Sequence, residues 1–277
     1  MRIKFSKMHG LGNDFVLIDN ISRKIALSAE KIRHLADRRT GIGCDQVLLV
    51  ESAVAPGADF AMRILNADGS EAEQCGNGVR CFTVFVRELG LASSTSELTI
   101  ATAGGLVRSR LESSEQISVD MGVPRLELSE IPFLAPKRAP SYSLDIGGEV
   151  VTIGAVSMGN PHAVMQVDDV RTAPVSTFGP LIQRHRDFPR GANVGFMQVI
   201  DARHIRLRVF ERGAGETPAC GTGACAAVVV GHEQGLLQDS VEVSLPGGRL
   251  YVALRSGNCR VWMTGPAVRV FDGEIEV

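Results

Sequence analysis

The feature that most constrains how this chain can fold is an internal duplication. Met62–Cys75 aligns with Leu207–Cys220 at an offset of 145 residues, which places Cys75 on Cys220. A Gly-x-Gly tripeptide follows each cysteine, and an apolar stretch then leads to a Gly-Leu pair. Two further matches continue the series at offsets of 143 and 147: Thr99–Gly105 with Glu242–Gly248, and Gly12-Asn13 with Gly159-Asn160. An ordered series at nearly constant offset predicts two copies of one folding unit.

The duplication divides the 277 residues into two predicted domains of ordinary size. We expect the first domain to span residues 1–122 and the second to span residues 123–265. The joint is predicted within Gly122–Gly148, because four prolines interrupt any regular period there: Pro124, Pro132, Pro136 and Pro140.

Each copy contains a short strand, a polar glycine-rich loop and then a helix that begins at or just after the cysteine. In the first copy, apolar residues recur at helical spacing and leave a narrow polar stripe. The apolar positions are Val79, Phe82, Val86 and Leu89, and the polar stripe is Arg80, Thr83 and Arg87. Such a helix needs cover on most of its sides. Gly90 and Gly235 are well placed to end the two helices.

Short apolar or alternating segments predict strands elsewhere in both halves. The predicted strands are Arg2–Phe5, Val16–Asp19, Gln46–Glu51, Met62–Leu65, Thr99–Ala101, Ile117–Asp120, Val150–Ile153, Met197–Asp201, Leu207–Phe210, Val241–Ser244, Leu250–Leu254 and Arg260–Met263. We therefore expect an α/β (α+β) fold of two pseudo-symmetric domains, each a strand-rich shell around one central helix.

Composition excludes several classes of protein. The chain has 29 basic and 31 acidic residues, and this balance argues against a nucleic-acid-binding surface. Its longest apolar runs, Val47–Val50 and Ala224–Gly231, are far shorter than a membrane span needs. No secretory signal is visible at the amino terminus, so we expect a cytoplasmic protein with free thiols at its six cysteines.

Cys75 and Cys220 each precede a Gly-x-Gly that opens a predicted helix. Thiolates are favoured at helix N-termini, so a lowered pKa is expected at both cysteines. The glycines let a substrate carboxylate approach the same backbone N–H groups. Two such thiols, facing one another across a cleft between the domains, suit removal of a proton from one face of a carbon and its return to the other, which is two-base racemisation or epimerisation.

A lone Cys-Gly-x-Gly is more often a buried structural cysteine, and only the duplication favours chemistry here. The other cysteines are predicted to be structural: Cys44, Cys81, Cys225 and Cys259.

Six segments resemble the signatures of the diaminopimelate epimerase family, occur in the right order and span nearly the whole chain. They are Lys7–Phe15, Gly43–Gln46, Asn66–Cys81, Met158–Val164, Gly191–Phe196 and Glu211–Ala226. The resemblance implies an isomerase that interconverts LL- and meso-2,6-diaminopimelate at one α-carbon, in lysine biosynthesis. It also implies that no cofactor, pyridoxal phosphate or metal is needed, and that the enzyme is a homodimer. The carboxyl-terminal strand, residues 266–277, is expected to cross back to the first domain.

The resemblance also implies roles for individual residues. Cys75 and Cys220 would be the acid and base, supported by His162 and Glu211. The substrate-binding residues would be Asn13, Gln46, Asn66, Gly76, Asn77, Asn160, Asn193, Glu211, Arg212, Gly221 and Thr222. These types suit a zwitterion, because amides both donate and accept, arginine grips a carboxylate and glutamate accepts from an ammonium. Phe271 stands where the family usually has a tyrosine that supports the dimer interface.

The sequence also contains patterns that could indicate other functions. Gly221–Ala226 fits a dinucleotide-binding G-x-G-x-x-A, but a ten-residue loop separates it from the preceding strand. The cysteine spacings match neither a redox C-x-x-C nor a zinc site. Two alternatives stay open: a related cofactor-independent racemase of the proline or hydroxyproline type, and a non-catalytic amino-acid-binding protein. An intact cysteine pair counts against the second, because binding alone needs no thiols.

Overall fold

The computed structural model describes every residue except 1, 22–24, 94–96, 114, 256 and 258. Contacts divide the chain into two compact units. The first unit comprises Met1–Asp120 and Thr264–Val277, and the second comprises Met121–Met263. The chain therefore returns to the first unit near its carboxyl terminus, through the last strand.

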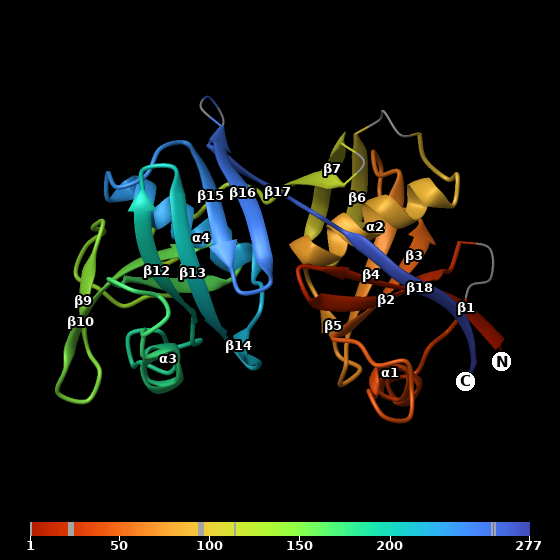
Figure 1. The fold of residues 1–277 in the computed structure, drawn as a ribbon, viewed down its shortest axis with the longest axis horizontal. Coiled ribbons are helices and arrows are strands. Elements are labelled where there is room, and N and C mark those ends of the chain that lie inside the picture. The colour runs from red at the N-terminus through yellow and green to blue at the C-terminus, as the bar shows by residue number, and fades with distance from the viewer. Residues whose placement is uncertain (1, 22–24, 94–96, 114, 256, 258) are drawn as a thin grey trace. The chain divides into compact units, whose positions relative to one another are not determined.

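The first unit contains two helices and a series of strands (Figure 1). Its elements are β1 (Arg2–Gly10), β2 (Asn13–Asp19), α1 (Ala29–Ala36), β3 (Gln46–Ser52), β4 (Phe60–Asn66), β5 (Glu71–Ala72), α2 (Gly76–Glu88), β6 (Leu98–Thr102), β7 (Gly105–Ser113), β8 (Gln116–Asp120) and β18 (Val268–Glu276).

The second unit has the same kinds of element. Its elements are β9 (Tyr142–Asp145), β10 (Val150–Ser157), β11 (Pro161–Gln166), α3 (Val175–Gln183), β12 (Asn193–Asp201), β13 (His204–Glu211), β14 (Gly215–Thr217), α4 (Gly221–Glu233), β15 (Ser240–Leu245), β16 (Gly248–Arg255) and β17 (Arg260–Gly265). From β10 to β17 they follow the order of β1 to β8 in the first unit. The outer strand β9 comes first in the chain, whereas the corresponding β18 comes last. The last residues of β17 belong to the first unit.

Strand pairing repeats between the units. In the first, β1 pairs with β2 antiparallel, β2 with β3 parallel, β3 with β4 antiparallel and β4 with β6 parallel. In the second, β10, β11, β12, β13 and β15 make the same succession of pairings. The outer strand also matches, because β18 pairs with β1 as β9 pairs with β10. The predicted duplication is thus confirmed as a repeated topology.

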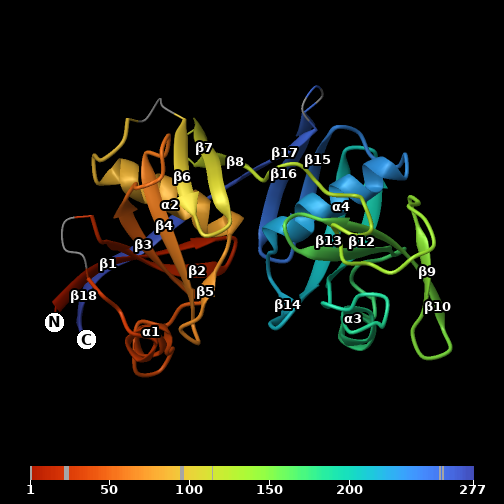
Figure 2. The same cartoon turned by 180° about the vertical axis from the view of Figure 1, so that it is seen from behind.

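Strands of its own unit surround each long helix (Figures 1 and 2). Helix α2 contacts β1, β2, β3, β7 and β8, and α4 contacts β10, β11, β12, β13 and β16. Every α4 side chain from Ala224 to Val230 is buried, which explains why its sequence is apolar all round. Gly90 and Gly235 follow the helices with φ of 72° each, as the C′ position requires.

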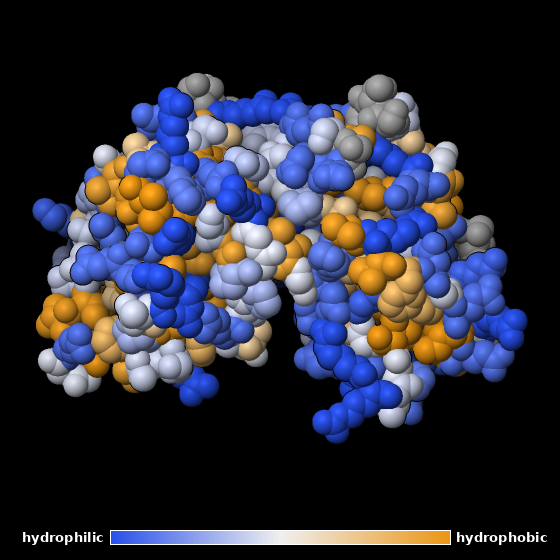
Figure 3. Space-filling model, viewed as in Figure 1, coloured by the Kyte–Doolittle hydropathy of each residue, from blue (hydrophilic) through white to orange (hydrophobic). Residues whose placement is uncertain are grey.

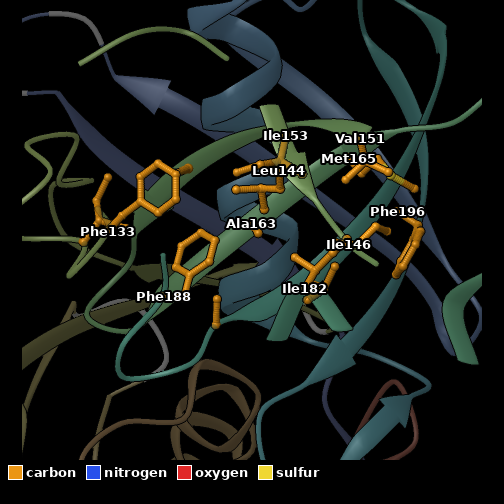
Figure 4. Close-up of a cluster of buried hydrophobic side chains, with 14 of the residues drawn as sticks. Phe133, Leu144, Ile146, Val151, Ile153, Ala163, Met165, Ile182, Phe188 and Phe196 are labelled. Carbon is orange, nitrogen blue, oxygen red and sulfur yellow. The ribbon is translucent and has the colours of Figure 1, made fainter. Parts of the chain in front are cut away.

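A second hydrophobic layer lies under the short helix of each unit. In the second unit, Val175 and Ile182 of α3 pack with strand residues such as Ile153 and Phe196 (Figure 4). The Phe133 and Phe188 rings stack there with centroids 4.5 Å apart. In the first unit, Ile32 of α1 packs in the equivalent way on β1, β2 and β3. These layers hold the strands that carry the site residues.

Two details differ from the sequence-based expectations. The polar stripe of α2 is not exposed at Arg80 and Thr83, which are fully buried. Buried polar groups need partners, and Thr83 Oγ1 donates to the Val79 carbonyl while Arg80 Nε donates to the Pro266 carbonyl. In addition, the proline-rich joint contains a strand, β9, despite its irregular sequence. Among the described residues, none of the helices has the length and apolar character that a membrane crossing requires.

Candidate active site

Each candidate cysteine is the N-cap of the central helix of its unit. Cys75 precedes α2 and Cys220 precedes α4, and both have extended backbone angles. Each thiol sulfur accepts a hydrogen bond at 3.4 Å from the backbone N–H three residues on, at Gly78 or Gly223. The sulfur therefore occupies the place that a serine or aspartate oxygen takes in an ordinary N-cap.

The last glycine of each Gly-x-Gly lets the helix backbone approach the sulfur. A Cβ atom at residue 223 would lie 3.0 Å from Val209 Cγ2 and 3.2 Å from Cys220 Sγ. Both separations are tighter than ordinary van der Waals contacts, so a side chain here would push the thiol or β13 away. At residue 223 glycine is therefore needed because there is no room for a Cβ atom between Val209 and the Cys220 sulfur.

Cys75 is half-buried and lies beside two amide side chains. Its Sγ donates toward Asn13 Oδ1 at 3.9 Å, and Asn77 Nδ2 donates to the same oxygen at 3.2 Å. Asn13 begins β2 and Asn77 is in the first turn of α2. Three predicted site residues are thus brought together, with Gly76 as the first residue of the helix.

Gln46 and Asn66 form a second pair in the first unit. They are directly opposite on the antiparallel strands β3 and β4, and Gln46 Nε2 donates to Asn66 Oδ1 at 2.8 Å. Asn66 Nδ2 in turn donates to Ser70 Oγ at 3.0 Å. Gln46 Oε1 is buried and accepts no hydrogen bond from any described residue. It is therefore an oxygen acceptor available to a ligand.

Cys220 is buried and lies beside a carboxylate. Its Sγ donates to Glu211 Oε2 at 3.1 Å and lies 3.6 Å from Thr222 Oγ1. Thr217 Oγ1 donates to the other oxygen, Glu211 Oε1, at 2.5 Å. Glu211 ends β13 and Thr217 ends β14, which pairs with β13. Sequence reasoning did not identify Thr217, although its position just before the Pro-Ala-Cys segment was a usable signal.

The expected lowering of the thiol pKa is wrong for Cys220. Burial raises the pKa of Cys220 well above its ordinary value, and the negative charge of Glu211 raises it further. The hydrogen bond from the Gly223 N–H acts in the opposite direction but is weaker. Desolvation therefore outweighs the helix N-terminus, and Cys220 is a neutral thiol at pH 7.

His162, Asn160 and Asn193 are close together at the start of β11 and β12. His162 and Asn193 are paired across these parallel strands, and His162 Nε2 lies 3.0 Å from Asn160 Oδ1. Burial, with a smaller effect of the Arg212 charge, lowers the pKa of His162 to about 3. The imidazole is consequently neutral at physiological pH.

Arg212 and Phe271 complete the predicted set. The Arg212 backbone N–H donates to Asn193 Oδ1 at 2.8 Å, and its guanidinium donates to the Arg190 carbonyl at 2.9 Å. Phe271 lies on β18, half-exposed, with its ring edge-on to that of Phe5. Gly221 is the first residue of α4.

Comparisons with known proteins show similarity over nearly the whole chain. The family model for diaminopimelate epimerase matches residues 5–127 and 154–270. A diaminopimelate epimerase from Alkalilimnicola ehrlichii is 57% identical over 278 residues, covering 100% of both chains. One from Nitrosospira multiformis is 55% identical over 277 residues, covering 100% of this chain and 99% of the relative.

Solved structures show the same fold at low identity. A phenazine biosynthesis protein of the PhzF family from Bacillus anthracis superposes with a TM-score of 0.71 at 20% identity, covering 100% of both chains. A hydroxyproline epimerase from Agrobacterium vitis superposes with a TM-score of 0.71 at 18% identity, covering 99% of this chain and 92% of the other.

Proposed function

The chain belongs to the diaminopimelate epimerase family, and on that premise we propose that it interconverts LL- and meso-2,6-diaminopimelate by two-base chemistry at Cys75 and Cys220. The observation that carries the proposal is the repeated N-cap cysteine. Each unit places a thiol at the start of its central helix, beside polar side chains. The proposed pathway is lysine biosynthesis.

The proposed reaction moves one proton onto and one proton off the α-carbon. A thiolate at one cysteine takes the α-proton and becomes a thiol, while the C–H electron pair remains on the substrate. The thiol of the other cysteine donates its proton to the opposite face and becomes a thiolate. Because Cys220 is a thiol at rest, it serves as the acid when Cys75 serves as the base, and the roles exchange in the reverse reaction.

The backbone at the two helix starts supports the negative charge that develops during this transfer. Removing an α-proton sends electron density toward the substrate carboxylate, and N–H groups at a helix N-terminus stabilise such a charge. Gly76 with Asn77, and Gly221 with Thr222, are the proposed contacts. They are placed to bind and orient the carboxylate that takes up this charge.

Glu211 is proposed to accept the proton of the Cys220 thiol and to return it. Its Oε2 already accepts the thiol S–H at 3.1 Å, so the carboxylate is placed to hold or return that proton. Neutral His162 is proposed to orient Asn160 through their 3.0 Å contact rather than to carry charge. Asn13, Gln46, Asn66, Asn160, Asn193 and Arg212 are the proposed substrate-binding side chains. The open oxygen of Gln46 suits a substrate ammonium.

Proton NMR of LL-2,6-diaminopimelate with reduced protein in D₂O tests the function. We expect loss of the α-proton signal and formation of the meso isomer with no added cofactor. Proline and hydroxyproline, run in parallel, test the related racemase. Exchange on proline alone would move the activity to that class. No exchange on any of these substrates, with both thiols reduced, would support a binding protein.

We further propose a cytoplasmic homodimer. Val268, Val270 and Phe271 of β18 are between 43% and 55% exposed, and Figure 3 shows hydrophobic side chains gathered over the part of the first unit where Figure 1 places this strand. A second copy of the chain would cover them. Light scattering after size exclusion tests this, and a Phe271→Asp variant is expected to be monomeric. A monomeric wild-type protein would refute the dimer.

A further inference from the structure

A directed chain of hydrogen bonds runs through the side chains that face Cys75. Arg80 Nη1 donates to Asn77 Oδ1 at 2.9 Å, and Asn77 Nδ2 donates to Asn13 Oδ1 at 3.2 Å. Asn13 Nδ2 then donates to Asp45 Oδ2 at 2.8 Å. A guanidinium begins the chain and a carboxylate ends it, with two amides between them. We call these four residues the amide relay.

The charged ends fix the direction of both amides. Arginine only donates hydrogen bonds and an ionised carboxylate only accepts them. Asn77 must therefore turn its oxygen toward Arg80, and Asn13 must turn its nitrogen toward Asp45. The remaining amide atoms then meet as donor and acceptor. With neutral ends that both donate and accept, either orientation of Asn13 would be satisfied.

The direction of the relay decides which atom meets the Cys75 sulfur. Since Asn13 Nδ2 is held by Asp45, Asn13 Oδ1 is the atom that lies 3.9 Å from Cys75 Sγ. We propose that Arg80 and Asp45 are positioning residues that keep a carbonyl oxygen, rather than an N–H group, against the Cys75 thiol. An oxygen acceptor favours the protonated sulfur, so the thiolate remains a strong base toward a weakly acidic α-proton.

Further charges hold Asp45 and the adjacent backbone in place. Arg38 donates to both Asp45 and Asp14, at 2.8 and 2.7 Å. Lys7, itself buried, donates to Asp14 at 2.6 Å. Although burial opposes ionisation, the hydrogen bonds from Arg38 and Lys7 hold the pKa of Asp14 well below its usual range. These four groups and Arg80 are the charges joined to the amide relay by the hydrogen bonds described, and the neutral Cys81 thiol lies on the same helix as Arg80.

The second unit shows that the fold itself does not need the relay. At the offset of 147 the position of Asp45 is occupied by Ala192, and at the offset of 145 that of Arg80 is occupied by Cys225. The same strand pairings and the same helix form there without these charges. Burying a guanidinium costs free energy. The buried Arg80 guanidinium orients groups beside only one of the two thiols, which indicates a role at that thiol and not in the fold.

An Asp45→Asn variant tests the proposal at an exposed position, where folding is not at risk. Its amide oxygen can accept from Arg38 or from Asn13 but not from both. When that oxygen stays with the charged donor Arg38, an N–H faces Asn13 and reverses that amide. We expect the pH midpoint for alkylation of Cys75 by iodoacetamide, followed by peptide mass spectrometry, to fall by about one unit. We also expect kcat for α-proton exchange to fall about tenfold.

Glu112→Gln is the matched control, because Glu112 is an exposed carboxylate of the same unit that accepts from Arg110 at 2.6 Å. Its alkylation midpoint should equal that of the wild type. An unchanged midpoint in Asp45→Asn would overturn the proposal, even with reduced kcat, since a purely structural defect would lower kcat alone. The catalytic consequence rests on the proposed function, but the alkylation midpoint needs no turnover. Failure of the epimerase proposal would therefore be recognised separately.

Discussion

The two units share a backbone and differ in what surrounds the cysteine. Asn66 and Glu211 occupy equivalent positions at the offset of 145, at the ends of β4 and β13. Asn66 bonds to Gln46, whereas Glu211 accepts from the Cys220 thiol. Cys75 faces a neutral amide, and Cys220 faces a carboxylate in a more buried place.

The two units therefore share a backbone fold but have different charged and polar groups around their cysteines. His162 stands at the position of Phe15, and Ala192 at that of Asp45, both at the offset of 147. The group that accepts from the thiol therefore differs between the units. It is an amide oxygen at Cys75 and a carboxylate at Cys220. A two-base enzyme needs one thiol and one thiolate at a time, and the carboxylate beside Cys220 favours the thiol more strongly than the neutral amide oxygen beside Cys75 does.

The largest expected effect comes from removing either thiol. Cys75→Ala and Cys220→Ala should each lower the epimerisation rate by about 10²–10⁴-fold, because general acid–base catalysis contributes that much. Proton NMR with LL-diaminopimelate measures it. The control is Cys81→Ala, which should stay active, since the equivalent residue of the second unit is Ala226. Full activity in either N-cap variant would refute the two-base reaction.

A smaller effect is expected from neutralising the carboxylate beside Cys220. Glu211→Gln removes a negative charge that raises the pKa of Cys220, so alkylation of this thiol should begin at lower pH. Turnover should fall about 10–100-fold, the worth of one charge-assisted hydrogen bond. The rate of Cys220 alkylation, measured against pH, gives the direction in which the pKa of this thiol changes.

Glu216→Gln is the control for this variant, because Glu216 is a carboxylate of the same unit that accepts from Arg208 at 2.6 Å. Glu216→Gln should not change the pH dependence of Cys220 alkylation. If Glu211→Gln did not change it either, burial alone would explain the raised pKa of Cys220.

The two units are expected to differ in stability at residue 154, which corresponds to Ser6 in the strand register of the first unit. A Cβ atom at Gly154 would lie 2.3 Å from Val230 Cγ1 of α4. We expect Gly154→Ala to lower the free energy of unfolding by about 1–3 kcal/mol through overpacking. Urea denaturation measures this. Gly147→Ala is not a suitable control because its φ is 81°. Gly195→Ala on β12 serves instead, because its Cβ would come no closer than 3.4 Å to a neighbouring atom, and it should leave the midpoint unchanged. An unchanged midpoint in Gly154→Ala would mean that β10 can move away from α4.

The smallest expected effect at pH 7 concerns His162, and it changes sign in acid. Its pKa of about 3 in the folded protein lies below the ordinary value of 6.5. The unfolded chain therefore binds the extra proton between these values, and stability falls as pH falls through this window. The slope approaches about 1.4 kcal/mol per pH unit. His162→Phe, which copies Phe15, should lack this component while losing about 1 kcal/mol at pH 7 with the Asn160 contact.

Denaturation midpoints of the wild type and His162→Phe at pH 7, 6, 5 and 4 check this prediction. The two curves should cross between pH 6 and pH 5, with the wild type the less stable protein at pH 4. Parallel curves would mean that the imidazole has the same pKa in the folded and unfolded protein.

Local patterns predicted most of the strands but not the short helices. Every predicted strand lies within an observed one, because alternation and β-branched runs are properties of adjacent residues. Helix α1 was missed although Ser28 caps it through the Lys31 N–H. Helix α3 was missed because Gly179 and Pro180 lie inside it, and these residues normally interrupt helices.

The site was predictable as a set of residues, and less so as a set of contacts. The motifs around Asn13, Cys75 and Cys220 named side chains that do lie together within each unit. Arg80 was assigned to a polar stripe, because a charge on an amphipathic helix is usually solvated. Its burial depends on the Pro266 carbonyl, 186 residues away in sequence, which no local pattern reveals.

The sequence alone determined the duplication, the central helices that begin at Cys75 and Cys220, and the family. These follow from spacing and residue type, which a linear chain displays directly. Only the tertiary structure decided that Cys220 is a buried neutral thiol against Glu211, and that two amides beside Cys75 point in one direction. The physical reason is that protonation and hydrogen-bond direction depend on desolvation and on charges brought close by folding, and neither is encoded at a fixed distance along the chain.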